Sequence, residues 1–402
     1  MLSYLLIRLF TFPLIFLSYR NLHKLGRFLG AIAYHLIPKF RKRALCNLSL
    51  TNLNLNEKEL RKVAKESIQN LMITCLEYAK FDYEKNIAKV AYCDNPEEAN
   101  TYIEKGKGVI FFCGHQSNWE ILFLEGTSRM PGTAIGRPIK NIYLYNWILR
   151  IRQKFGGKII TPKTAVKEGL RALKRGSFLG IVGDQGMPDS GFCCPFLGKL
   201  AWTSPLPALL AYRTECPLIV ATTTRIKGKY KIHYSDPILP NPAASLEEEV
   251  DRMMKEALGI FEKSVRKSPG EWLWIHNRWK QQVPGRLKRK FRHESIAIVL
   301  DHDYKKMLPY LKVFREIYPT EFITLFVPKD CMAIEDFEVI YYKKLEEVLK
   351  SPKHFKLVFN FSENKEISKH FKKQSAFRVS TLKDLKEEDE NLGEVLKSAI
   401  LA

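Results

Sequence analysis

Short apolar runs that end in polar, glycine-containing turns are the feature that most constrains the fold. Val109–Cys113 is such a run with a glycine on each side, and Phe178–Val182 is another, followed at once by Gly183-Asp-Gln-Gly186. Runs of this length without polar alternation are typical of strands buried on both faces of a sheet. Residues 164–175 have helical spacing that stops at Gly176. Strands that alternate with helices predict a layered α/β domain.

Other patterns extend this α/β prediction along the chain. They are a capping box at Asn56 and Glu59 before a helix to Ala79, a strand pair at 218–224 and 229–234, and a helix capped by Ser245 that ends near Lys267. Beyond the basic run Arg286-Leu-Lys-Arg-Lys-Phe-Arg292 the alternation restarts, with strands expected near 295–300, 322–327, 337–341 and 356–361. We therefore expect a second, smaller α/β unit over residues 293–402.

The N-terminus is strongly apolar. Residues 1–19 are almost wholly aliphatic and aromatic, apart from Arg8 and Pro13, and a weaker apolar stretch precedes the basic run Lys39-Phe-Arg-Lys-Arg43. A cleaved signal peptide is disfavoured because no charged segment precedes the apolar run and no small-residue cleavage site follows it. A buried helix pair and a membrane anchor, spanning or interfacial, remain open. We favour the anchor, because Arg8 lies off the centre of the apolar run and could snorkel, which avoids the cost of about 2.5–3.5 kcal/mol for an arginine at the bilayer centre.

Charge and cysteine content limit the partners. The net charge of +22 favours an anionic membrane, a phosphorylated substrate or nucleic acid. No recognition-module signature supports nucleic acid, so we expect none. The eight cysteines form no CxxC pair and have no histidine cluster beside them, so we expect no metal site, no disulfide framework and a reducing compartment. The turn Asp301-His-Asp303 would suit a nucleotide or a metal, but no glycine-rich phosphate loop accompanies it.

Candidate catalytic chemistry lies in Gly114-His-Gln-Ser-Asn-Trp-Glu120, directly after the first strand. A histidine can take a proton from a hydroxyl, and a carboxylate on its other ring nitrogen orients it and stabilises the imidazolium. On one continuous helix His115 and Glu120 would point about 140° apart. They can meet only across a turn, so we expect a strand, a turn at 116–118 and a helix that opens near Trp119. Cys113 and Ser117 are nucleophiles only in a rival scheme.

This run resembles the HX4D/E motif of the lysophospholipid-type acyltransferases. More narrowly, the chain resembles the late acyltransferases of lipid A biosynthesis, the lauroyl/myristoyl transferases of Gram-negative bacteria. Four further blocks follow in that family's order, and they are Gly136-Arg-Pro-Ile-Lys-Asn141, Gly183-Asp-Gln185, Phe196-Leu-Gly198 with Thr203, and Pro269-Gly-Glu-Trp-Leu-Trp-Ile-His276 with Arg278 and Lys280. The resemblance covers roughly residues 1–285, and it leaves the C-terminal unit unexplained.

The resemblance implies transfer of a fatty acyl chain from acyl carrier protein to a hydroxyl of a phosphorylated, Kdo-bearing lipid A precursor, without a cofactor. His115 would be the general base and Glu120 its orienting partner. Arg137 and Asp184 would shape the site and bind polar parts of the substrates, and Arg278 and Lys280 would contact headgroups. For Trp272, Trp274 and Trp279 we expect packing in the core or at the membrane interface.

The expected organisation has three parts: a membrane anchor with its basic flank (1–45), a layered acyltransferase domain (46–285) and the extra α/β unit (293–402). The positive-inside rule places the catalytic domain on the cytoplasmic face of a bacterial inner membrane, with the basic flank at anionic headgroups. Two alternatives stay open. One is an acyltransferase for a lysophospholipid or another glycolipid, and the other is a non-catalytic basic scaffold at the membrane.

Overall fold

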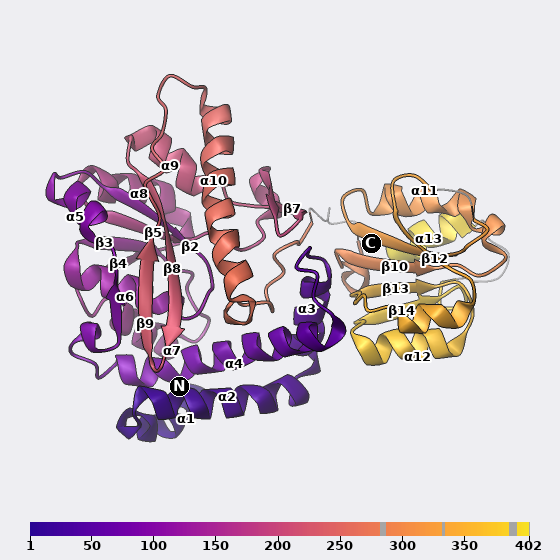
Figure 1. The fold of residues 1–402 in the computed structure, drawn as a ribbon, viewed down its shortest axis with the longest axis horizontal. Helices are drawn as coiled ribbons and strands as arrows, with labels where there is room; N and C mark the ends of the chain where they lie inside the picture. Colours follow the sequence, from indigo (N-terminus) through magenta and orange to yellow (C-terminus); the bar gives the residue numbers. More distant parts are fainter. Residues whose placement is uncertain (282–286, 332–333, 386–391, 402) are drawn as a thin grey trace. The chain divides into compact units, whose positions relative to one another are not determined.

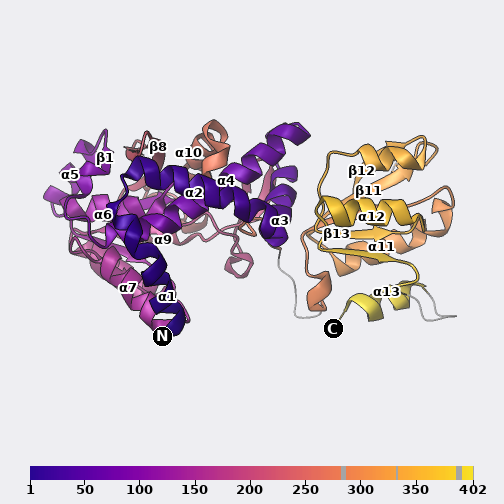
Figure 2. The ribbon, with the colours of Figure 1, turned by 90° about the horizontal axis from the view of Figure 1, so that it is seen from below.

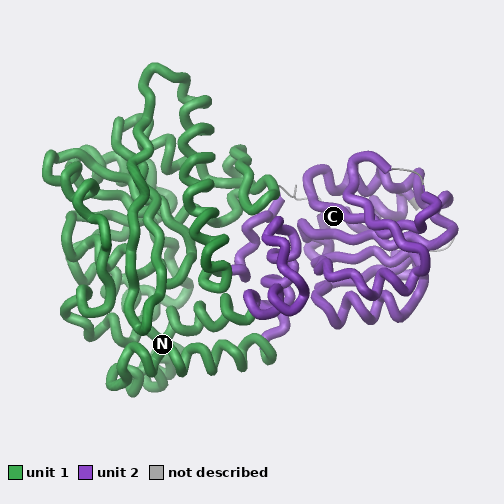
Figure 3. The backbone as a smooth tube through the Cα atoms, in the orientation of Figure 1, with its two compact units in different colours: residues 1–36, 65–273 green, residues 37–64, 274–402 purple. Residues whose placement is uncertain are grey.

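The computed structural model describes residues 1–281, 287–331, 334–385 and 392–401 (Figure 1). Its contacts divide the chain into two compact units (Figure 3). Unit 1 comprises Met1–Leu36 and Lys65–Leu273, and unit 2 comprises Ile37–Ala64 and Trp274–Ala402. The boundary that we expected at residue 285, and Arg286 of the basic run, lie outside the described residues.

Unit 1 is built on a seven-stranded sheet. The strand order is β1 (Ala91–Cys93), β9 (Lys229–Tyr234), β8 (Leu218–Ile226), β2 (Val109–Cys113), β5 (Phe178–Val182), β3 (Gly132–Ile135) and β4 (Lys158–Ile160). Neighbouring strands are parallel except β8 and β9, which form an antiparallel hairpin. The predictions of β2, β5, β8 and β9 are confirmed, whereas β1, β3 and β4 were missed because each has only three or four residues.

Helices cover both faces of this sheet. The connections from β2 to β3 and from β3 to β4 pass through α6 (Trp119–Arg129) and α7 (Ile142–Arg152) on one face. The connections back through α8 (Ala165–Lys174) and α9 (Leu206–Thr214), with α10 (Leu246–Lys267), cover the other. Parallel crossovers are almost always right-handed, so reversing the direction of winding moves the helices to the opposite face. The winding reverses between the neighbouring strands β2 and β5, and this is the switch point at which open α/β sheets bind ligands.

Smaller elements complete unit 1. They are α5 (Glu97–Glu104), the part of α4 (Glu57–Phe81) from residue 65 onward, and the hairpin of β6 (Cys193–Phe196) and β7 (Lys199–Trp202). The predicted cap of α10 is confirmed, because the Ser245 side chain accepts a hydrogen bond from the Glu248 amide. The predicted capping box of α4 is also confirmed, since Asn56 and Glu59 exchange side chain to backbone hydrogen bonds.

The N-terminal segment packs on unit 1. Helix α1 (Leu2–Thr11) and the 3₁₀ helix η1 (Phe12–Phe16) precede α2 (Tyr19–Leu36). Figure 2 shows α1 beside α7, where Arg8 binds Asp82 at 2.7 Å and lies over the Trp147 ring. Arg8 therefore has an anion within its own unit. Most side chains of α1 and η1 are nevertheless exposed and apolar, including Phe10 and Phe16.

No helix in the described ranges is long and apolar enough to cross a membrane. The spanning form of the expected anchor is thus not among the described helices. The basic flank also differs from the expectation, because Lys39–Arg43 lies on α3 (Pro38–Ser49), which belongs to unit 2. There Lys42 donates hydrogen bonds to the carbonyls of Lys372 and Ala376 instead of standing free for headgroups.

Unit 2 contains a five-stranded, wholly parallel sheet. Its order is β12 (Glu338–Tyr342), β11 (Phe322–Pro328), β10 (Ser295–Val299), β13 (Leu357–Asn360) and β14 (Arg378–Thr381), with α11 (Leu308–Ile317), α12 (Lys365–Gln374) and α13 (Leu392–Ile400). Along β10, Ile296 and Ile298 enter one apolar core, and Ala297 and Val299 enter the other. The four strands expected here are confirmed, and β14 was missed.

The turn after β10 shows no built ligand site. His302 and Asp303 are exposed, and Asp303 pairs with Lys306 at the surface. Within the described part of unit 2, Asp301 and Asp303 belong to no group of three side chains able to hold a metal ion. The polar centre of this unit is instead structural, since Lys356 donates to Asn47 and forms a buried ion pair with Glu294.

Candidate active site

The segment after β2 folds as a sharp turn into a helix, as the sequence predicted. Asn118 is the N-cap of α6, and its side chain accepts a hydrogen bond from the Glu120 amide at 3.0 Å. Ser117 has a φ of +52°, a conformation that costs free energy for a residue with a side chain. Its carbonyl accepts hydrogen bonds from Asn70 and Thr74 of α4, which hold the turn in place.

A buried polar network supports this turn from behind. The Asn118 amide donates to Glu77, which also accepts hydrogen bonds from Tyr230 at 2.6 Å and lies 2.7 Å from a ring nitrogen of His23. The Glu77 side chain is fully buried. Removing a buried acceptor from such a set leaves several donors unpaired, so the network fixes one conformation of the turn.

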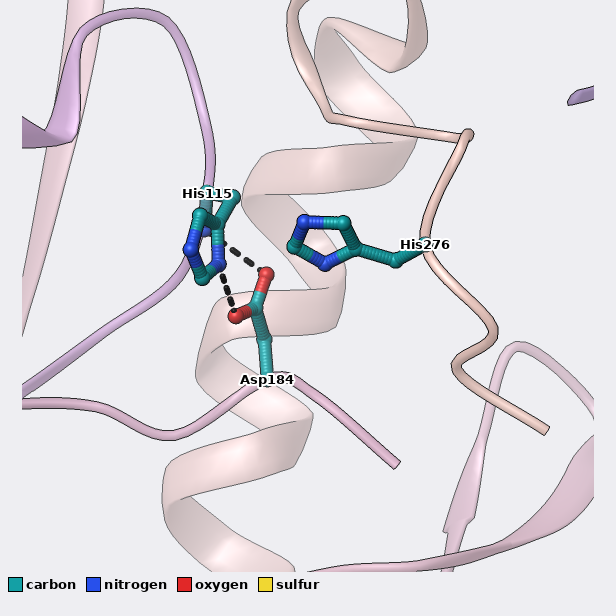
Figure 4. Close-up of side chains that lie close together, drawn as sticks. All are labelled: His115, Asp184 and His276. Atoms are coloured by element: carbon teal, nitrogen blue, oxygen red, sulfur yellow. Dashed lines mark hydrogen bonds and ion pairs between the residues drawn. The ribbon is translucent and has the colours of Figure 1, made fainter. Parts of the chain in front are cut away.

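Asp184 holds His115 at the end of β2. Its Oδ1 lies 2.7 Å from the ring Nδ1, and its Oδ2 accepts a hydrogen bond from the His115 backbone amide at 2.7 Å (Figure 4). A carboxylate can only accept, so Nδ1 carries the proton and the lone pair of the neutral ring is on Nε2. The Gln185 side-chain amide lies 3.3 Å from Nε2. This arrangement suits proton abstraction at Nε2.

Strand register brings these two residues together. Strands β2 and β5 are parallel neighbours, and Cys113 lies opposite Val182. His115 and Asp184 each lie two residues past the last residue of their strand, on the two sides of the switch point. The approach is close, because a Cβ on Gly114 would lie 2.8 Å from the Asp184 carboxylate and 2.1 Å from the Phe261 ring. A side chain at position 114 would push apart His115 and Asp184, which we call the dyad.

Trp272 also binds Asp184. Its indole Nε1 donates to Asp184 Oδ2 at 2.7 Å, and the whole side chain is buried. Of the two places expected for this tryptophan, the core or the membrane interface, the structure has it in the core, and its hydrogen bond was not predicted. A carboxylate that accepts three hydrogen bonds has its charged form stabilised.

Glu120 has a different partner from the one expected. Arg152, at the end of α7, binds it through two nitrogens at 2.6 and 2.7 Å, and the Trp119 indole donates to it at 3.0 Å. Burial opposes ionisation of Glu120, but Arg152 outweighs it and holds the pKa of this carboxyl below its usual value. The carboxylate on Nδ1 of His115 is that of Asp184. The expected pairing of Glu120 with His115 is wrong, because Glu120 lies in the first turn of α6 and faces α7, whereas His115 faces the end of β5.

The dyad opens into a cavity of about 480 Å³. Its polar wall contains His115, Glu120, Arg152, Gln185 and Arg137, and its remaining wall is mostly apolar. Arg137 is exposed at this wall and makes no side-chain hydrogen bond or ion pair with another described residue. Its position fits the expected role in binding a polar part of a substrate, because a guanidinium can donate two hydrogen bonds to the oxygens of a phosphate.

A second, smaller cavity of about 50 Å³ shares part of its wall with the first. The two share Trp119, Phe123, Ala134 and Val182 as wall residues. The lining of the smaller cavity is almost wholly apolar, and it ends at aromatic side chains that include Phe111, Phe178 and Tyr234. A cavity with polar groups at His115 beside a smaller apolar cavity suits an amphipathic acyl compound.

Comparison with known proteins agrees with this chemistry. The sequence model of the family described as bacterial lipid A biosynthesis acyltransferase matches residues 1–281. The chain belongs to this family. It is also 25 % identical to a lipid A biosynthesis acyltransferase of Haemophilus influenzae over 279 residues, which cover 66 % of this chain and 84 % of that relative. This lipid A acyltransferase is therefore an O-acyltransferase, and its reaction belongs to lipid A biosynthesis.

Two further site residues were expected from the sequence. Arg278 and Lys280 belong to unit 2, where Arg278 is fully buried and Lys280 is exposed. Cys113 is a poor candidate for a covalent mechanism, because burial and the neighbouring carboxylates raise the pKa of its thiol far above the usual value. A buried thiol that stays protonated is a weak nucleophile.

Proposed function

We propose that this lipid A acyltransferase transfers a fatty acyl chain from acyl carrier protein to a hydroxyl of a phosphorylated, Kdo-bearing lipid A precursor, with His115 as the general base. The observation that carries the proposal is the Asp184–His115 pair at the mouth of a cavity that is polar on one side and apolar on the other.

The chemistry follows from the proton positions. Nε2 of His115 takes the proton of the acceptor hydroxyl while its oxygen attacks the carbonyl carbon of the donor thioester. Asp184 stabilises the imidazolium that forms, because it accepts the Nδ1 proton at 2.7 Å. When the tetrahedral intermediate collapses, the C–S bond breaks, and the departing thiolate takes the proton from Nε2. The products are the ester and the free thiol of the donor, and His115 returns to its neutral form.

The cavity walls suit the two substrates. The Arg137 guanidinium, exposed at the mouth, would bind a phosphate of the acceptor through two nitrogens. The smaller cavity beyond Trp119 and Phe123 would take the distal carbons of the acyl chain, each buried CH₂ contributing about 0.8 kcal/mol. Glu120 and Arg152 would form a fixed part of the wall of the larger cavity, since they form an ion pair with each other.

The apolar face of α1 and η1 supports an interfacial contact with the membrane. A short helix with an exposed apolar face can lie in the headgroup region without crossing the bilayer. Ile142 and Tyr143 at the start of α7 are also exposed beside α1, where Tyr143 stacks on Tyr4. We place the enzyme on the cytoplasmic face of the bacterial inner membrane, with this surface toward the lipid.

One assay tests the proposal. Purified full-length protein is given labelled acyl carrier protein and either a Kdo-bearing tetra-acyl precursor or a lysophospholipid. We expect transfer to the precursor, and a loss of about 10²-fold or more in kcat for His115→Ala with unchanged thermal unfolding. Transfer only to the lysophospholipid would overturn the acceptor assignment. Equal activity of wild type and His115→Ala would overturn the catalytic role of His115, and absence of transfer by wild type to either acceptor would favour a scaffold.

A further inference from the structure

Helix α8 presents a row of cations to solvent. Lys163, just before the helix, and Lys167, Arg171, Lys174 and Arg175 follow at spacings of four, four, three and one, and all are exposed. The opposite side of α8, with Ala172 and Leu173, is buried in unit 1. Residues three and four apart share one side of a helix. The five cations therefore form a single basic strip.

A neighbouring loop lengthens the strip. Lys105 and Lys107 are exposed, and the loop that carries them packs on the end of α8, because a Cβ on Gly108 would lie 2.6 Å from the Leu173 carbonyl. The acid on the helix, Glu168, is already bound by Lys158 at 3.0 Å and by Arg171 at 2.7 Å. The remaining six cations make no side-chain hydrogen bond or ion pair with any described residue.

Such a strip opposes the stability of the helix that carries it. Like charges at i and i+4 destabilise a helix by about 0.2–0.5 kcal/mol per pair. Lys167 and Arg171 are such a pair within α8. An acidic partner would turn this repulsion into attraction, and a single-sign surface also steers an oppositely charged partner to it.

The strip begins at the catalytic cavity. Pro162 and Ala165, at the start of α8, line the cavity that contains His115. Helix α8 connects β4 to β5, which run in the same direction, so it runs against them. Its first turn therefore lies at the carboxyl edge of the sheet, beside His115 and Asp184, and its last turn lies at the opposite edge. A partner seated along the strip reaches the cavity at one end.

The apolar surface lies on the other side of the sheet. Helix α1 packs on α7, which covers the opposite face from α8, and Figure 1 shows α1 at the lower end of unit 1 and α8 in its upper half. A bilayer that contacts the apolar side chains of α1 is thus away from the strip. This separation favours a soluble acidic partner over an anionic membrane.

We propose that the strip of Lys163, Lys167, Arg171, Lys174 and Arg175, with Lys105 and Lys107, is the docking surface for the acidic carrier protein that brings the acyl thioester. The proposal rests on the proposed function. The carrier lies along α8, and its thioester arm enters the cavity past Pro162 and Ala165 toward His115.

A charge-reversal pair tests the proposal. Lys167→Glu/Lys174→Glu changes the strip, and Lys85→Glu/Lys89→Glu makes the same change of net charge at exposed lysines elsewhere in unit 1. Binding of fluorescently labelled holo carrier protein is measured by anisotropy. Transfer is measured from acyl carrier protein and from acyl-pantetheine, a donor without the protein.

For the strip variant we expect at least tenfold weaker carrier binding and a similarly raised KM for acyl carrier protein, with the rate from acyl-pantetheine unchanged. The control variant should match wild type. Equal carrier binding by both variants would overturn the docking surface. An equal loss of the transfer rate from acyl-pantetheine would do the same. So would a strip variant that binds the carrier normally but no longer binds anionic vesicles. Absence of transfer by wild type from either donor would count against the proposed function, whereas the binding measurement would still report on the strip.

Discussion

Asp184 binds His115 twice, through Oδ1 to the ring Nδ1 and through Oδ2 to the backbone amide, each at 2.7 Å. One carboxylate thus fixes both the backbone position and the ring orientation of the histidine. Oδ2 also accepts a hydrogen bond from the Trp272 indole N–H, so the ring, the backbone amide and the indole all donate to this carboxylate. The site therefore requires a side chain at position 184 whose two oxygens both accept hydrogen bonds.

Asp184→Asn should lower kcat by about 10²-fold or more while the protein stays folded. If the amide oxygen keeps the two hydrogen bonds of Oδ2, the amide NH₂ faces Nδ1 and forces it to accept. The proton then moves to Nε2, where the base is needed. Steady-state kinetics check this, with Trp272→Phe as the control that removes one donor and keeps the tautomer. Wild-type kcat in Asp184→Asn would contradict the assignment.

Arg152→Met should destabilise the protein by about 3–5 kcal/mol, because it leaves the buried Glu120 carboxylate without its bidentate partner. The double variant Glu120→Gln/Arg152→Met should cost less than the sum of the two single variants, as measured by urea unfolding. Since Asp184 still holds His115 in the double variant, we expect the kcat of the double variant to stay within about tenfold of wild type. A loss as large as that of Asp184→Asn would show that Glu120 acts in the chemistry.

Gly180→Ala should shift the donor preference toward shorter acyl chains. Gly180 lines the smaller apolar cavity, and a Cβ there would make an ordinary contact of 3.6 Å with Ala134 Cβ, so the variant can fold while the cavity shrinks. Competition between donors of different chain length measures the preference. Gly259→Ala is the matched control, because its Cβ meets open space on α10. An unchanged preference in Gly180→Ala would place the acyl chain elsewhere.

Phe10→Glu/Phe16→Glu should weaken binding to anionic vesicles by at least about tenfold, because both side chains are exposed on the apolar face of α1 and η1. Co-sedimentation with the vesicles measures the binding. Leu239→Glu changes an exposed apolar side chain of unit 1 outside α1 and η1 and should have no effect. Equal loss in both variants would remove the special role of the N-terminal segment.

Glu321→Gln should stabilise unit 2 at pH 8 and not at pH 5. Burial raises the pKa of the Glu321 carboxyl from 4.5 to about 7. The folded state therefore binds this proton more tightly than the unfolded state. Its contribution is complete below about pH 4.3 and is lost as the pH rises through 7, a loss of at most about 3 kcal/mol.

Because the variant cannot ionise, we expect a gain of about 1–2 kcal/mol over wild type at pH 8. Urea unfolding followed by hydrogen exchange of unit 2 amides measures it at both pH values. Glu335→Gln, at an exposed position of the same unit, is the control. A gain of the same size at pH 5 would mean that the effect does not come from ionisation.

Local sequence determined the elements around the site. Five uninterrupted β-formers before Gly114 predicted β2, and the five residues before Gly183 predicted β5 in the same way. The five-residue spacing of His115 and Glu120 led us to expect a turn at 116–118 and a helix from near Trp119, and the structure has Asn118 as the cap of that helix. These features depend on neighbours within a few residues, so the sequence by itself was enough.

Only the tertiary structure decided which carboxylate serves His115. Glu120 is close in sequence, but the turn of the helix directs it to Arg152, whereas Asp184 lies 69 residues away and reaches the ring. The choice depends on β5 being the parallel neighbour of β2 in a register that sets Cys113 opposite Val182. Strand order and register arise from the packing of whole strands and crossover helices, and no spacing within the chain encodes them locally.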